Sequence, residues 1–131
     1  MPFVTLTVRK PKSVEFKSAV LDAVHGALVA AFRIPPEDKH VRLLVHEPHR
    51  FLCSSTLAEP DLATLVTVDC FAGRSLDAKR SLYDLVVDGL ATLGIPRDHV
   101  MITLREHPRE NWGIRGGRAG CDVELGFAVD V

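Results

Sequence analysis

Cysteine is scarce in this sequence, and its three copies, Cys53, Cys70 and Cys121, lie far apart with no C-x-x-C pair. An odd number of scattered cysteines argues against a disulfide framework and against a structural zinc site, and it fits a reducing cytoplasm. The six histidines form neither H-x-x-x-H nor H-E-x-x-H, the spacings with which a helix presents metal ligands. We therefore expect a cytoplasmic protein without a metal site.

An excess of charge of either sign is also absent, because 16 Lys and Arg stand against 17 Asp and Glu, a formal net charge of −1. No overall basic field exists to hold nucleic acid or an anionic membrane. The longest run without Asp, Glu, Lys or Arg is Ala23 to Phe32, which is too short to span a bilayer. No charged-then-apolar signal opens the chain. We expect neither nucleic acid nor a membrane as a partner.

Apolar residues, by contrast, are plentiful enough for a core. They make up 47% of the 131 residues, with 25% charged, which is ordinary for a globular protein and argues against disorder. A chain of this length supports one domain, and folding should remove roughly two-thirds of its unfolded surface from water. We predict a single domain over residues 1–131.

An internal repeat organises the chain, with one copy in residues 2–48 and the other in residues 64–108. At an offset of 62, residues of the first copy meet identical residues of the second: Val4, Thr5, Ser13, Lys17, Asp22 and Leu28 meet Val66, Thr67, Ser75, Lys79, Asp84 and Leu90. Such self-similarity fixes the architecture, because each copy is one structural unit. Thr64 stands where Pro2 stands in the first copy.

Each copy reads as β-α-β. Residues 3–8 alternate between apolar and polar and are rich in β-branched residues, which predicts a strand. Ser13 and Ser75 occupy N-cap positions, each followed by a stripe of apolar residues at i, i+3, i+4 spacing. Prolines then stop both helices, and residues 41–47 and 100–106 read as return strands. A β-α-β crossover makes the two strands of each copy parallel.

The rest of the chain is a link and a tail. The link, Pro48 to Pro60, is expected to lie on the surface, and the tail, residues 109–131, reads as a glycine-rich loop followed by a strand over 122–131. We predict an α/β (α+β) fold: a four-stranded sheet with two helices on one face, plus a C-terminal strand. The other face of the sheet is left bare, so we expect it to pack against other subunits.

Three segments carry a family resemblance: MPFVTL at the start of a strand, AGRSLDAK at the second turn, and ENWGIRGG in the terminal loop. In this order and spacing they resemble the tautomerase superfamily, whose 4-oxalocrotonate tautomerase-like members are built on β-α-β units and use an amino-terminal proline. The resemblance covers nearly the whole chain. It implies a double-length, fused member related to malonate semialdehyde decarboxylase, assembled as a homotrimer and independent of any cofactor.

The resemblance assigns the central chemistry to Pro2 and Arg74. Removal of Met1 would leave Pro2 with a free secondary amine, and an α-amino group titrates near pH 8, so modest desolvation or a nearby cation makes it a neutral base. Arg74, in the G-R-S turn, would hold a substrate carboxylate bidentately and help to depress the pKa of that amine. Its counterpart in the first copy is Lys12, in a cluster with Arg9 and Lys10 that is either a second anion contact or a solvated turn.

Five further residues are candidates by the same resemblance. Asp38 matches an aspartate that decarboxylase-like members use to activate water, although the neighbouring Glu37 could be the aligned residue. Arg42 would bind a substrate carboxylate or carbonyl. Trp112 would wall the pocket and lower its dielectric constant, and Asn111 and Arg115 are lesser substrate-binding candidates.

We therefore predict a tautomerase-like isomerase that moves a proton between oxygen and carbon of a small carboxylate-bearing enol or 2-keto acid, with Pro2 as general base and then acid. Two alternatives stay open. One is a decarboxylase or hydratase of a small 3-oxo acid, although the R-P-R pattern of that group is A-G-R here, with Ala72 in place of one arginine. The other is a non-catalytic oligomeric binding protein in which Pro2 is inert.

Overall fold

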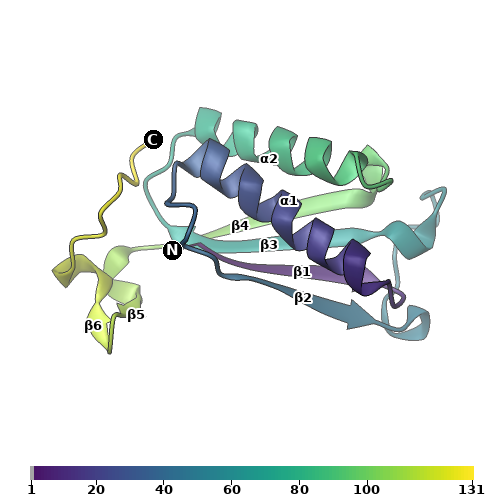
Figure 1. Ribbon diagram of the computed structural model, residues 1–131, viewed down its shortest axis with the longest axis horizontal. Helices are drawn as coiled ribbons and strands as arrows, with labels where there is room; N and C mark the ends of the chain where they lie inside the picture. The colour runs from purple at the N-terminus through teal and green to yellow at the C-terminus, as the bar shows by residue number, and fades with distance from the viewer. Residues whose placement is uncertain (1) are drawn as a thin grey trace.

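The computed structural model describes residues 2–131. Its main body is a four-stranded sheet in the order β2-β1-β3-β4, with both long helices on one face (Figure 1). The first copy supplies β1 (Phe3–Arg9), α1 (Val14–Phe32) and β2 (Val41–His46), and the second supplies β3 (Thr64–Phe71), α2 (Leu76–Ala91) and β4 (Val100–His107). The predicted pair of β-α-β units is confirmed.

The two copies meet at the centre of the sheet. β1 pairs parallel with β2, β3 pairs parallel with β4, and β1 pairs antiparallel with β3. In that antiparallel pair Phe3 lies opposite Asp69. The start of the first copy therefore lies beside the end of β3 and the turn that leads into α2 (Figure 1).

Both helices begin at the predicted caps. The Ser13 hydroxyl accepts a hydrogen bond from the Phe16 N–H at 3.1 Å, and the Ser75 hydroxyl accepts one from the Ala78 N–H at 3.1 Å. Each bond satisfies one of the free donors at a helix start. α1 ends at Arg33, whose left-handed φ of 55° lets its N–H bond the Val29 carbonyl.

The core lies between the helices and the sheet. The inward positions of β1 and β3 alternate as predicted, and they pack against the helix stripes that the sequence indicates: Val4, Leu6, Val66 and Val68 against Val20, Val24, Leu28, Phe32, Leu82, Val86 and Leu90, all at 1% exposure or less. Among residues 2–131, no helix is both long and apolar enough to cross a membrane.

The opposite face of the sheet is uncovered in the single chain. Strand pairing places Leu44, Thr7, Leu65 and Met101 in one row across all four strands. Leu44, Leu65 and Met101 are 47%, 40% and 69% exposed. We call this row the open-face row. A row of exposed apolar side chains on a flat sheet is the kind of surface that partner chains cover.

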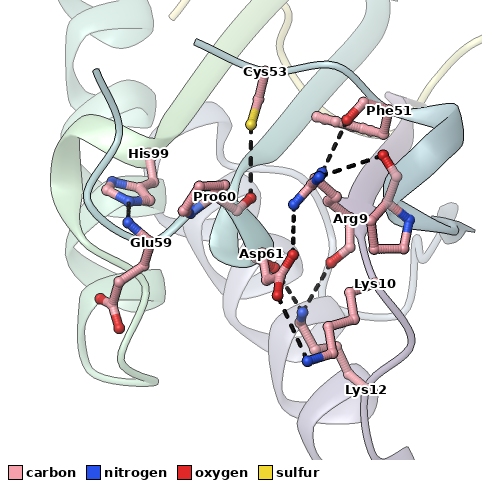
Figure 2. A network of polar contacts seen from close by, with 10 residues as sticks. Arg9, Lys10, Lys12, Phe51, Cys53, Glu59, Pro60, Asp61 and His99 are labelled. Atoms are coloured by element: carbon pink, nitrogen blue, oxygen red, sulfur yellow. Dashed lines mark hydrogen bonds and ion pairs between the residues drawn. The ribbon is translucent and has the colours of Figure 1, made fainter. Parts of the chain in front are cut away.

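The link between the copies is on the surface, as expected, but it is firmly held. Arg9 at the end of β1 donates to the Phe51 carbonyl at 2.9 Å and pairs with Asp61 at 2.5 Å (Figure 2). Lys12 donates to the carbonyls of Arg9 and Asp61 at 2.8 and 2.6 Å. These bonds fix the path of the chain from β2 to β3.

The predicted C-terminal strand over 122–131 does not form, which corrects the sequence interpretation. The strands of this region are the two-residue β5 (Gly113–Ile114) and β6 (Arg118–Ala119), which pair with each other in the glycine-rich loop. Residues 123–131 run from β5 and β6 up to the start of α2 (Figure 1) and belong to no strand. Their side chains still alternate between more and less buried, because every second one packs inward.

Candidate active site

The candidate residues come together at one end of the sheet. Pro2 directly precedes β1, and the Val4 N–H donates to the His40 carbonyl at 2.8 Å, which places the turn before β2 beside it. The antiparallel pairing of β1 with β3 brings the turn at Arg74 to the same end (Figure 1). Residues from both copies thus build this end of the molecule.

Pro2 is buried. Burial in general disfavours the charged form of an amine. Met1, whose removal would create that amine, lies outside the described residues.

Arg74 is a buried cation that has no anionic partner among residues 2–131. Its side chain is 5% exposed, its Cζ lies 4.7 Å from the centre of the Phe32 ring, and its Nη1 donates to the Phe71 carbonyl at 3.3 Å. Among residues 2–131, no acceptor satisfies its Nε or Nη2, although both atoms are buried. Burial lowers its pKa, while Cys70 and Glu106 oppose that shift.

Such an arrangement is costly unless a ligand completes it. A buried donor left unpaired costs about 1–3 kcal/mol, and more when it is charged. The cation–π contact with Phe32 and the single bond to Phe71 offset part of that cost. Two unpaired donor nitrogens of one guanidinium match the two oxygens of a carboxylate, so the position suits bidentate anion binding.

Trp112 forms part of an aromatic cluster at the same end. Its ring packs edge-on against Phe71 at 4.9 Å and Phe3 at 5.2 Å, and it lies 5.9 Å from His107. The side chain is 8% exposed, and its Nε1 is buried without a partner among the described residues. An apolar wall of this kind excludes water and strengthens electrostatic interactions beside it.

Asp38 and Arg42 flank the start of β2. The Asp38 side chain is 15% exposed and lies 3.1 Å from His40 Nε2, whereas Glu37 is exposed to solvent. The His40 ring in turn packs edge-on against Phe3 at 5.0 Å. Arg42 is exposed and borders a hollow of about 290 Å³ together with Phe3 and His40. Both candidates therefore lie near the residue that follows Pro2.

The two lesser candidates, Asn111 and Arg115, lie in different surroundings. Asn111 borders a hollow of about 230 Å³ together with Phe3 and Trp112, so it belongs to the site end. Arg115 turns away and donates to the carbonyls of Glu124 and Leu125 at 2.6 and 3.3 Å. The structure thus gives Arg115 a role in holding the tail.

An ion-pair cluster at this end was missed in the sequence. Asp69 pairs with His107 Nε2 at 3.0 Å and with Arg105 at 2.9 Å. Burial raises the pKa of the Asp69 carboxyl, but hydrogen bonds from His107 and Arg105 outweigh this and lower it overall. The available signal was the placement of three charged or titratable residues at the ends of two neighbouring parallel strands.

The second copy has no equivalent site. Thr64, the counterpart of Pro2, is buried, and its hydroxyl donates to the Leu62 carbonyl at 3.0 Å. Lys12 is the counterpart of Arg74, and its ammonium group donates to the carbonyl oxygens of Arg9 and Asp61 (Figure 2). Burial lowers the pKa of Lys12, and Asp61 opposes that shift. The link therefore closes the end that would have been a second site.

Groups of three or more potential metal ligands are absent from residues 2–131. The groups that the structure brings to this end are a buried proline, an unpaired guanidinium, an aromatic wall and a carboxylate beside a histidine. Such groups can bind a small anion and move a proton near it.

Comparisons with known proteins find tautomerases. The family model described as tautomerase enzyme matches residues 38–115. A probable tautomerase of Ralstonia nicotianae is 38% identical over 53 residues, which is 40% of this chain and 76% of that protein.

Solved structures share the whole fold. A malonate semialdehyde decarboxylase inhibited by 3-bromopropiolate is 26% identical, with a TM-score of 0.79 over 88% of this chain and 91% of that one. A native fused 4-OT is 18% identical, with a TM-score of 0.83 over 92% and 98%. Further fused 4-OT structures are symmetric or asymmetric trimers. The family match and the shared architecture lead to one conclusion: this chain belongs to the tautomerase family.

Proposed function

We propose that this protein is a cofactor-independent isomerase that interconverts the enol and keto forms of a small carboxylic acid, with Pro2 as the proton carrier. The observation that carries the proposal is Arg74, a buried cation with two unpaired N–H groups at the same end of the sheet as a buried Pro2. Loss of Met1 is a requirement, because an acylated proline nitrogen is not basic.

The proton transfer balances without any other reactant. The neutral Pro2 nitrogen takes the proton of the enol hydroxyl, and the O–H electron pair forms the C=O bond. The electron pair of the former C=C bond then takes a proton from the charged Pro2 nitrogen, which becomes neutral again. The net change moves one proton from oxygen to carbon, so a single base that acts in both steps is sufficient.

Arg74 has two roles in this scheme. Its Nε and Nη2 bind the substrate carboxylate, which orients the enol toward Pro2. Its charge also stabilises the dienolate that develops between the two steps, and it favours the neutral form of the Pro2 amine. The wall formed by Trp112, Phe3 and Phe71 keeps water away and makes both effects stronger.

The working unit in this proposal is a homotrimer of single-domain chains, 1–131 each, in the cytoplasm. Its support is the open-face row, which leaves Leu44, Leu65 and Met101 exposed, and the trimeric state of fused 4-OT proteins with the same fold. Because Thr64 is not a free amine, each trimer would contain three proline sites. Sedimentation of the purified protein tests the trimer directly.

A decarboxylase or hydratase is the second candidate. It is favoured by the 26% identity to a malonate semialdehyde decarboxylase and by Asp38, a partly buried carboxylate near the site end that could activate water. In that mechanism Pro2 would act as a charged acid. Ala72 removes one of the two arginines that such chemistry would use to hold the substrate, so we rank this candidate second.

Two measurements separate the candidates. Mass spectrometry of the purified chain shows whether Met1 is lost; retention would leave only a binding role. Wild-type and Pro2→Ala proteins are then assayed on 2-hydroxymuconate, phenylenolpyruvate and malonate semialdehyde. We expect enol turnover that falls by about a hundredfold or more in Pro2→Ala, since general acid–base catalysis contributes on this scale. Enol turnover that survives the substitution contradicts the proline mechanism.

A further inference from the structure

The last residues of the chain, 123–131, form a segment that we call the C-terminal strap. The strap touches the residue on each side of Arg74. A Cβ on Gly73 would lie 3.2 Å from Val129 Cγ1. Ser75 donates to the Val131 carbonyl from its backbone N–H at 3.2 Å and from its hydroxyl at 2.8 Å. Figure 1 shows this segment running from β5 and β6 up to the start of α2.

The strap is held mainly by apolar contacts of Val123, Leu125, Phe127 and Val129, and by few backbone hydrogen bonds. It belongs to no helix or strand, and its backbone N–H groups beyond Val123 make no hydrogen bond within the described chain. Its backbone is held by donors from elsewhere: Arg109 bonds the Val123 carbonyl, and Arg115 bonds those of Glu124 and Leu125. Segments with so few internal bonds open at a low free energy compared with core strands.

Space for movement lies directly beside the strap. A groove of about 740 Å³ is bordered by residues 121–130 and, on its other side, by Ala72, Gly73 and Arg109. Gly126, at a φ of +82°, sits within the strap and gives it a bend that other residues adopt rarely. A shift of the strap would break the apolar contacts of Leu125, Phe127 and Val129, but no backbone N–H bond beyond Val123.

The guanidinium of Arg74 is closed to an anion in this structure. The side chain is 5% exposed, yet Nε and Nη2 have no acceptor. An anion that completes these two bonds must reach atoms that solvent does not reach in this arrangement.

We propose that the C-terminal strap is a gate over Arg74, closed in this structure, and that it must lift before a carboxylate enters. The inference rests on the proposed role of Arg74 as the carboxylate anchor, but it concerns access and not proton transfer. Gly73 contributes directly, because the absence of its Cβ lets Val129 approach the turn.

Chemical modification of arginine by phenylglyoxal tests the gate in the full-length chain. Rates are followed by mass spectrometry of the peptides, with Arg80 on α2 as the internal reference, since its side chain is 64% exposed. We expect Arg74 in the wild type to react at least about ten times more slowly than Arg80, because reaction waits for an opening of the strap.

Two substitutions on the strap form a matched pair. Val129→Ser removes the apolar contact with Gly73 and should speed modification of Arg74 about fivefold, the effect of losing part of one valine's burial. Ala128→Ser changes an exposed neighbour on the same segment and should leave the rate unchanged. Equal Arg74 rates in wild type, Val129→Ser and Ala128→Ser would overturn the gate.

Hydrogen exchange of the wild type keeps the test decisive if Val129→Ser folds poorly. We expect the amides of residues 124–131 to exchange faster than those of β1 and β3. Protection as strong as in those strands would also overturn the proposal. Neither readout involves turnover, so the gate can fail while the Pro2→Ala result upholds the isomerase, and the reverse also holds.

Discussion

The guanidinium of Arg74 lies 4.7 Å from the ring of Phe32, the last residue of α1. Arg74 belongs to the second copy of the repeat and Phe32 to the first, so the candidate site is assembled from both copies. The same holds for Trp112, whose ring packs on Phe3 of the first copy and Phe71 of the second. Neither copy alone contains the arrangement.

Replacement of Arg74 should separate stability from activity. Arg74→Met keeps much of the volume and removes a buried, unpaired charge, so the free energy of unfolding should be unchanged or higher. Enol turnover should fall by about a hundredfold or more, because the carboxylate loses its anchor. Denaturant unfolding and kcat/KM check the two parts, with Arg80→Met on the exposed surface as the control. A strongly destabilised but active Arg74→Met would show that the arginine is structural.

The ion pair between Arg9 and Asp61, at the other end of the sheet, should contribute only to stability. Asp61→Asn weakens the pair with Arg9, which is partly exposed, and should cost about 1 kcal/mol of unfolding free energy. Asp77→Asn, in the exposed pair with Arg80, is the matched control and should cost less. Thermal unfolding and turnover are the measurements. Loss of turnover in folded Asp61→Asn would mean that the link reaches the candidate site.

Acid should weaken the fold in part through Asp69. Its pKa is lowered in the folded protein, so the carboxylate contributes stability above its unfolded pKa, and this contribution is lost as the pH falls through its folded pKa. Asp69→Asn removes the group that titrates. The free energy of unfolding should therefore decline less between pH 6 and pH 3 in Asp69→Asn than in the wild type. Identical declines would show that the ion-pair cluster is not coupled to folding.

Gly120 should tolerate no side chain. A Cβ there would lie 2.6 Å from the carbonyl oxygen of Arg109 and in tight contact with Trp112. Gly120→Ala should therefore destabilise the protein by about 1–3 kcal/mol and disturb the aromatic wall. Gly113→Ala, where nothing lies within 4 Å of the added carbon, is the control. Denaturant unfolding and tryptophan fluorescence of the two variants test the difference, and equal stabilities would contradict it.

The sequence predicted most of the fold because the repeat determines it. Ser13 and Ser75 cap helices as expected, and the alternation around Val4 and Leu6 indicates the buried face. These features depend on local spacing, which a sequence records directly. The C-terminal strand was predicted wrongly because alternation around Leu125 and Val129 reports which side chains turn inward, not whether a strand edge lies beside them.

The site was only partly predictable. Pro2, Arg74 and Trp112 were proposed from their motifs, and their roles stay predictions. The unpaired state of Arg74 depends on which acceptors fail to reach it, and spacing along the chain carries no such information. Arg115 was proposed as a substrate-binding residue from its place in the glycine-rich loop, and this stays a prediction; in the structure its side chain donates to carbonyls of the strap. The Asp69–His107 pair could not be predicted from the sequence, because it depends on the register between β3 and β4.

The titration of the Pro2 nitrogen tests the central claim most directly. Protein without Met1, labelled with ¹⁵N-proline, is titrated by NMR alongside the free peptide Pro-Phe-Val-Thr. The account predicts a Pro2 pKa below that of the peptide, and a rise toward the peptide value in Arg74→Met, because burial and the guanidinium both disfavour the charged amine. A Pro2 pKa equal to that of the peptide, or one that Arg74→Met leaves unchanged, would contradict it.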